Sequence, residues 1–107
     1  MISSVRKFFQ RKPLVVVIRL DGVIGAVSRF GSGGLDDSNT QKLLEKAFEF
    51  EKAKAIAIKI NSPGGSPTQS SLIASRILKL SEEKKIPVLC FCEDVAASGG
   101  YWLACAG

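Results

Sequence analysis

Apolar and polar residues alternate along the chain in a way that predicts strands and helices in turn. Three runs rich in β-branched and other apolar residues predict buried strands at 14–20, 55–60 and 87–92. The shorter run 23–27 predicts a second small strand or an extension of the first. A glycine-rich loop at 28–37 follows, and it lacks the strand-to-helix setting of a phosphate-binding fingerprint.

The segment after this loop predicts an amphipathic helix, because its apolar residues recur every three or four positions. The helix is expected to begin with a capping box made by Ser38 and Gln41 and to run to about Lys52. Near the end of the chain, the almost uncharged segment 96–107 predicts the start of a buried helix.

A further helix is predicted between the second and third strands. Ser66 is expected to cap it, Pro67 to occupy its first position, and Gln69 to close another capping box. The resulting order β-α-β-α-β-α predicts an α/β fold, with a parallel sheet and right-handed crossovers. Residues 13–107 are expected to form one partial domain, preceded by a tail at 1–12.

Two glycine-containing loops follow the second and third predicted strands. They are Asn61-Ser62-Pro63-Gly64-Gly65 and Ala97-Ser98-Gly99-Gly100. In a parallel sheet, loops after neighbouring strands emerge at the same edge, where α/β proteins usually build their sites. We therefore expect the two loops to meet there, one offering a serine hydroxyl and the other bare backbone N–H groups.

This pairing suggests acyl-transfer chemistry. Ser98 is the candidate nucleophile, and the Gly99 N–H is a natural first donor to an oxyanion. Gly64 or Gly65 could supply the second donor, because a glycine leaves the carbonyl oxygen unobstructed. Tight turns and close helix packing are the structural alternative for each glycine pair.

The serine would need a general base, and the chain contains no histidine. A lysine is the obvious substitute, as in Ser-Lys variants of the catalytic triad. Lys59 is predicted to point away from the buried face of its strand, while Lys84 and Lys85 fall at the wrong end of the sheet. The base is therefore expected to lie beyond Gly107.

INSPGG at 60–65, followed by KKIPV at 84–88 and AASGGYWLA at 96–104, resembles the signal peptide peptidase A family, serine peptidase family S49. The resemblance implies a crotonase-like, ClpP-like fold, Ser98 as the nucleophile, and Gly65 and Gly99 as oxyanion donors. It also implies a lysine base further along the chain, cleavage of hydrophobic remnant signal peptides, and homo-oligomers. We expect the peptide to contact four loop residues: Ser62, Pro63, Gly64 and Gly100.

Charge separates the amino terminus from the rest of the chain. The net charge is +5, and residues 1–12 hold four basic residues and no acid. Such a tail suits either a solvated end or peripheral contact with an anionic membrane. The remainder lacks the pattern of a nucleic-acid-binding protein, and no transmembrane segment or signal peptide is visible. We therefore expect a membrane-associated or cytoplasmic protein.

Three cysteines, Cys90, Cys92 and Cys105, are expected to be buried free thiols. They predict neither a disulfide framework nor a metal site, and no cofactor is expected.

Three functions remain open at this point. The first is a Ser/Lys endopeptidase represented by its amino-terminal portion. The second is a crotonase-like enzyme that uses the same oxyanion pocket on an acyl thioester, without a serine nucleophile. The third is a truncated, non-catalytic subunit that assembles with full-length partners.

Overall fold

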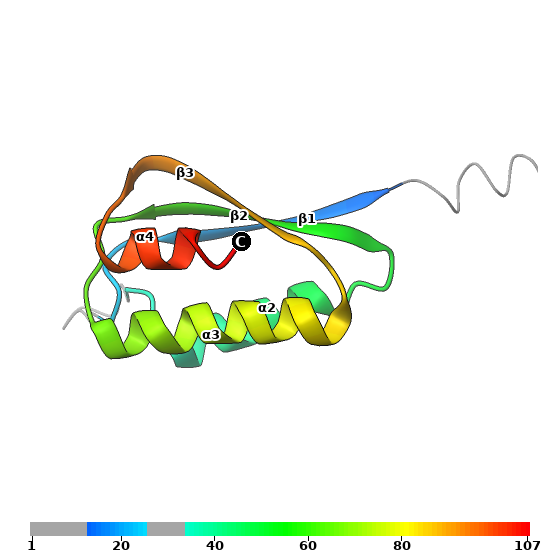
Figure 1. The fold of residues 1–107 in the computed structure, drawn as a ribbon, viewed down its shortest axis with the longest axis horizontal. Coiled ribbons are helices and arrows are strands. Elements are labelled where there is room, and N and C mark those ends of the chain that lie inside the picture. The colour runs from blue at the N-terminus through cyan, green and yellow to red at the C-terminus, as the bar shows by residue number, and fades with distance from the viewer. Residues whose placement is uncertain (1–12, 26–33) are drawn as a thin grey trace, which may run out of the picture.

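The chain folds as three strands alternating with three helices in the residues that the structure describes, 13–25 and 34–107 of a computed structural model (Figure 1). The sheet has the order β1-β2-β3, and both pairs of neighbours are parallel. The α/β prediction is thus confirmed. The elements are β1 (Leu14–Asp21), α2 (Asp37–Phe48), β2 (Ala53–Ser62), α3 (Pro67–Lys84), β3 (Val88–Ala96) and α4 (Gly99–Ala104).

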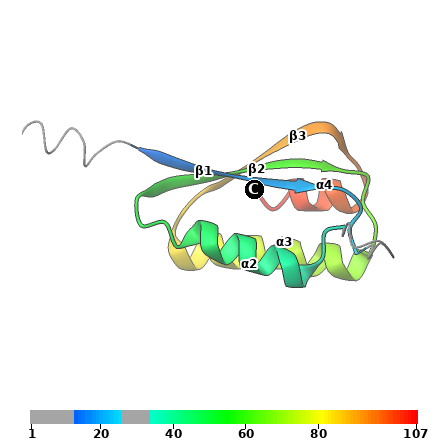
Figure 2. The ribbon, with the colours of Figure 1, turned by 180° about the vertical axis from the view of Figure 1, so that it is seen from behind.

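The helices lie on one face of the sheet, as the two opposite views agree (Figures 1 and 2). The core forms between these layers, because alternate strand residues point toward the helices. Ile56, Ile58 and Ile60 of β2 are completely buried there, as predicted. The other face of the sheet exposes apolar side chains of the two outer strands, which include Val15, Val17, Leu89 and Phe91.

Helix α2 begins and ends earlier than predicted. Asp36, not Ser38, is its cap: its carboxylate accepts from the Asn39 N–H at 2.8 Å, and Asn39 Oδ1 accepts from the Asp36 N–H at 3.3 Å. The predicted Ser38–Gln41 box is therefore wrong. Two candidate boxes overlap in this sequence, and the upstream pair satisfies the first N–H groups of the helix. The helix ends at Phe48, before the turn that leads into β2.

Helix α3 begins as predicted, with Ser66 as the cap and Pro67 at the first position. Ser66 Oγ accepts from the Gln69 N–H at 3.2 Å. The other half of the predicted box is wrong, because Gln69 Oε1 accepts from the Asp37 N–H of α2 at 2.7 Å instead. Beside this bond, Arg76 binds Asp37 through two hydrogen bonds of 2.9 and 3.0 Å. The amino-terminal ends of α2 and α3 are thus joined.

The strand ends also differ from the prediction. Within the described part of 23–27, Ile24 forms only isolated bridges, to Leu35 and Gly65. Strand β3 continues to Ala96, past an irregularity where Asn61 Oδ1 accepts from the Val95 N–H at 3.2 Å. The extra pairing draws the end of β3 toward the end of β2. The predicted tail at 1–12 lies outside the described residues.

The cysteines are all free, as predicted, but their predicted burial is wrong for two of them. Cys90 is half-buried, whereas Cys92 and Cys105 are exposed. The prediction that Cys92 is buried failed because β3 is an edge strand and its residues around Cys92 are mostly exposed.

Candidate active site

The loops that follow β2 and β3 meet at one edge of the sheet, as predicted (Figure 1). The Ala97 N–H donates to the Ser62 carbonyl at 3.1 Å, which joins the two loops directly. A Cβ placed on Gly64 would lie 2.7 Å from the Ser98 Cβ and 2.8 Å from the Gly99 nitrogen. Ser98 and the Gly64-Gly65 segment are therefore neighbours in space.

Ser98 has an unusual backbone conformation. Its φ of 52° and ψ of −120° lie outside the common left-handed region, although it is not a glycine. Such dihedrals are sterically costly and concentrate at functional sites. A comparable strained turn between a strand and a helix exposes the nucleophilic serine of α/β-hydrolases. Ser98 is exposed, and its hydroxyl makes no cap hydrogen bond to α4, so the hydroxyl is accessible to a ligand.

Two backbone N–H groups next to this serine are available. The Gly64 carbonyl accepts from the Ile24 N–H at 2.9 Å, and the Ser98 carbonyl accepts from the Trp102 N–H at 3.1 Å. In each trans peptide the following N–H points the opposite way. Within the described part of the chain, neither the Gly65 nor the Gly99 N–H has a hydrogen-bond acceptor. These are the two groups predicted to bind an oxyanion.

The glycines of both loops are closely packed. Gly64 and Gly65 have positive φ values of 101° and 150°, which favour glycine. A Cβ on Gly65 would collide with the Ile24 carbonyl, and one on Gly100 with the Ser62 carbonyl. A side chain at position 64, 65 or 100 would therefore force neighbouring backbone atoms to move.

The predicted peptide contacts differ in their exposure. Ser62 is completely buried, and its Oγ accepts from the Gly64 N–H at 3.1 Å. Gly64 and Gly100 are also buried, whereas Pro63 is exposed. Ser62 and Gly100 thus hold the two loops together, a supporting position that sequence reasoning missed. Contact of these residues with a peptide stays a prediction.

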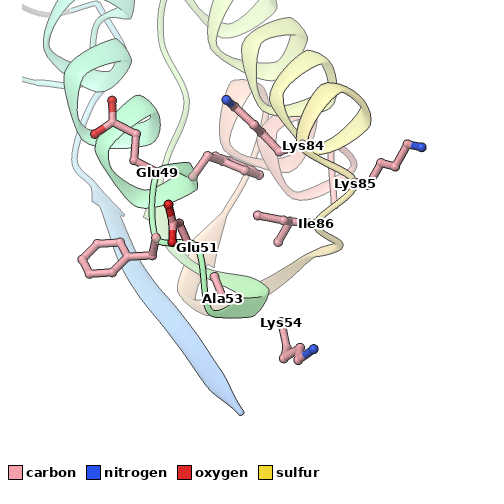
Figure 3. Close-up of a pocket in the computed structure, with 9 residues that line it drawn as sticks. Glu49, Glu51, Ala53, Lys54, Lys84, Lys85 and Ile86 are labelled. Atoms are coloured by element: carbon pink, nitrogen blue, oxygen red, sulfur yellow. The ribbon is translucent and has the colours of Figure 1, made fainter. Parts of the chain in front are cut away.

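The candidate lysines lie on other parts of the molecule. Lys59 alternates with the buried isoleucines of β2, and it pairs in register with Phe91 of β3. Lys84 and Lys85 line a cavity of about 600 Å³ beside the start of β2 (Figure 3). Glu49 and Glu51 also line that cavity, whereas none of the loop residues around Ser98 lines it. None of these three lysines belongs to the two loops.

The half-buried thiol of β3, Cys90, is a poor nucleophile. Burial raises the pKa of Cys90 to about 11, with smaller contributions from Cys92 and Cys105. Its Sγ donates to the Leu103 carbonyl at 3.7 Å. Since the thiolate is the reactive form of cysteine, burial keeps Cys90 mainly in its unreactive thiol form at neutral pH.

Comparison with known proteins identifies the family. No family model matches the chain. A "Serine protease SPPA, chloroplastic" from Arabidopsis thaliana is 38% identical over 96 residues, which cover 86% of this chain and 14% of that protein. "Protease 4" from Haemophilus influenzae is 33% identical over 92 residues, covering 84% and 14% respectively. This chain belongs to the signal peptide peptidase A family.

Another relative bears a different name. A "Na(+)/H(+) antiporter NhaA" from Brucella melitensis is 46% identical over 102 residues, which cover 95% of this chain. The match covers 14% of that protein, so the antiporter name belongs to a much longer polypeptide. The chain likewise spans only a small part of the proteases that it matches. Among residues 13–25 and 34–107, no helix has the length and apolar character needed to cross a bilayer.

Proposed function

We propose that this chain carries the nucleophile and the oxyanion-binding groups of a serine endopeptidase that cleaves hydrophobic remnant signal peptides. The observation that carries the proposal is the strained backbone of Ser98 beside the Gly65 and Gly99 N–H groups, for which residues 13–25 and 34–107 provide no hydrogen-bond acceptor. The general base would be a lysine outside these 107 residues. Relatives named as proteases support peptide hydrolysis over other acyl-transfer reactions.

The chemistry would proceed in two stages. The Ser98 hydroxyl attacks the scissile carbonyl carbon, and its proton passes to the neutral lysine amine. The resulting oxyanion accepts hydrogen bonds from the Gly65 and Gly99 N–H groups. The protonated lysine then gives its proton to the leaving amine as the peptide bond breaks. A water molecule hydrolyses the acyl-enzyme by the same route, which releases the carboxylate product and restores Ser98.

A lysine base must be neutral to accept this proton, which requires a site shielded from water. The exposed edge around Ser98 would therefore need further polypeptide to cover it, either from the same protein or from another subunit. Assembly into homo-oligomers and contact of residues 1–12 with an anionic membrane surface belong to the same proposal.

The experiment compares variants of the full-length protein that contains this chain and the family's lysine. Ser98→Ala should abolish both peptide cleavage and labelling by a fluorophosphonate probe while leaving folding intact. Ser75→Ala, which changes an exposed serine of α3 in the same way, should leave both unchanged. Full turnover by Ser98→Ala would refute the assignment of Ser98 as the nucleophile. An unlabelled wild-type protein would favour the thioester enzyme or the non-catalytic subunit, and affinity for acyl-CoA would identify the thioester enzyme.

A further inference from the structure

We propose that Ile24 is a positioning residue that sets the direction of the Gly65 N–H and its spacing from Gly99. The inference rests on the proposed function, because it assigns a role to these two N–H groups as an oxyanion site. Ile24 follows the end of β1 and lies in neither glycine loop. It nevertheless contacts both of them through separate parts of the residue.

The backbone of Ile24 binds the first loop on both sides of Gly65. Its N–H donates to the Gly64 carbonyl at 2.9 Å, and its carbonyl accepts from the Ser66 N–H at 2.8 Å. The Gly64 carbonyl and the Gly65 N–H belong to one trans peptide unit, so they point in opposite directions. The bond from Ile24 therefore turns the Gly65 N–H away from Ile24, and no acceptor for it lies within the described part of the chain.

This restraint matters because two consecutive glycines provide little stiffness of their own. Glycine adopts positive and negative φ with similar ease, and both Gly64 and Gly65 have positive values here. A rotation of the peptide plane between them would exchange the positions of its carbonyl and its N–H. A carbonyl in that place would repel a developing oxyanion instead of stabilising it.

The side chain of Ile24 contacts the second loop. It is only 1% exposed, and its Cδ1 lies 3.1 Å from where a Cβ on Gly99 would be. The terminal methyl group thus packs against the residue that bears the other candidate donor. One residue supports both N–H groups, through hydrogen bonds on one side and through van der Waals contact on the other.

Ile24 is itself held in place by the segment that leads into α2. The Leu35 N–H donates to the Val23 carbonyl at 2.8 Å, and Leu35 forms a parallel bridge with Ile24. The neighbouring residue Gly25 lies against the Ser66 side chain. The strand-like segment is thus paired on both sides, which makes it a rigid support and not a free loop.

The test removes one methylene group at two equally buried isoleucines of the full-length protein. Ile24→Val removes the contact with Gly99, whereas Ile56→Val shortens a completely buried side chain that pairs with Val88 at the start of β3. Both should lower the melting temperature by similar amounts. Only Ile24→Val should slow fluorophosphonate labelling of Ser98 and lower kcat, by about tenfold, with KM unchanged.

A second measurement is independent of catalysis. In protein labelled with ¹⁵N-glycine, Ile24→Val should shift the amide resonances of Gly65 and Gly99, and Ile56→Val should leave both in place. If the wild-type protein is not labelled by the probe, the proposed function fails, but these resonances still decide the role of Ile24. Equal effects of the two variants on labelling and on the glycine resonances would overturn the proposal, as would slower labelling without a resonance shift.

Discussion

Gly64 lies directly against Ser98: a Cβ on the glycine would come within 2.7 Å of the serine Cβ. No side chain fits between these two residues, so the loop after β2 and the turn before α4 are in direct contact. The same contact explains why glycine is needed at position 64 for reasons of space as well as of backbone conformation.

We expect Gly64→Ala to cost far more than the same change at Gly22. Both glycines have φ near +100°, so alanine is strained by roughly 1–2 kcal/mol at either position. A Cβ on Gly22 meets nothing within 4 Å, whereas one on Gly64 meets Ser98 and Gly99, which should add about 1–3 kcal/mol. Chemical denaturation measures the difference, and only Gly64→Ala should also slow labelling of Ser98. Equal stability of the two variants would contradict the described packing.

Ser98→Gly should stabilise the protein while it abolishes activity. Glycine relieves the dihedral strain at φ 52° and ψ −120°, for a net gain of about 1 kcal/mol after its greater loss of entropy on folding. Ser98→Ala should be equally inactive without the gain in melting temperature. Lys85→Gly is the control, since Lys85 also has a positive φ, of 55°, but caps the far end of α3. It should gain stability with normal activity.

The stability of the protein should fall as pH rises from about 9 to 11. Burial raises the pKa of Cys90 from 9.0 to about 11. Below pH 9 the thiol is neutral in both folded and unfolded chains and contributes no pH dependence. Above pH 9 the unfolded chain loses this proton first, which favours unfolding until the folded pKa is passed. Urea titrations at pH 7, 9 and 11 should show a smaller decline for Cys90→Ala, which lacks the buried thiol.

Residues 1–12 should bind anionic vesicles weakly and reversibly. Their four basic residues contribute roughly 1 kcal/mol each near such a surface, and the interaction weakens with salt. Co-sedimentation with vesicles that contain phosphatidylserine, at low and high salt, compares the intact protein with one that lacks the tail. Equal binding by the two forms would mean that the tail is only a solvated end.

Sequence patterns predicted the buried face of a strand and the edge of the sheet at which a loop emerges. Alternating isoleucines in β2 fixed its buried face, and the position of Ser98 after a strand placed it at the edge shared with Gly65. These inferences succeed because the period of a strand and the direction of a parallel sheet follow from the residues themselves.

Apart from the choice between two overlapping caps of α2, the features that were missed depend on partners far away in sequence. Gln69 could cap its own helix, but the Asp37 N–H binds its side chain instead. The exposure of Cys92 depends on its place at the edge of the sheet. Ile24 resembles any apolar residue after a strand, and only the folded chain brings it between Gly65 and Gly99. No local pattern carries this information, because each outcome is decided by competition in three dimensions.

The order of the sheet has a consequence for inheritance. Because β1, β2 and β3 are neighbours both in sequence and in space, the site residues named in this chain, from Ile24 to Gly100, lie in one stretch of sequence, whereas the proposed lysine base lies outside it. A single exchange of genetic material is enough to move such a stretch intact between genes.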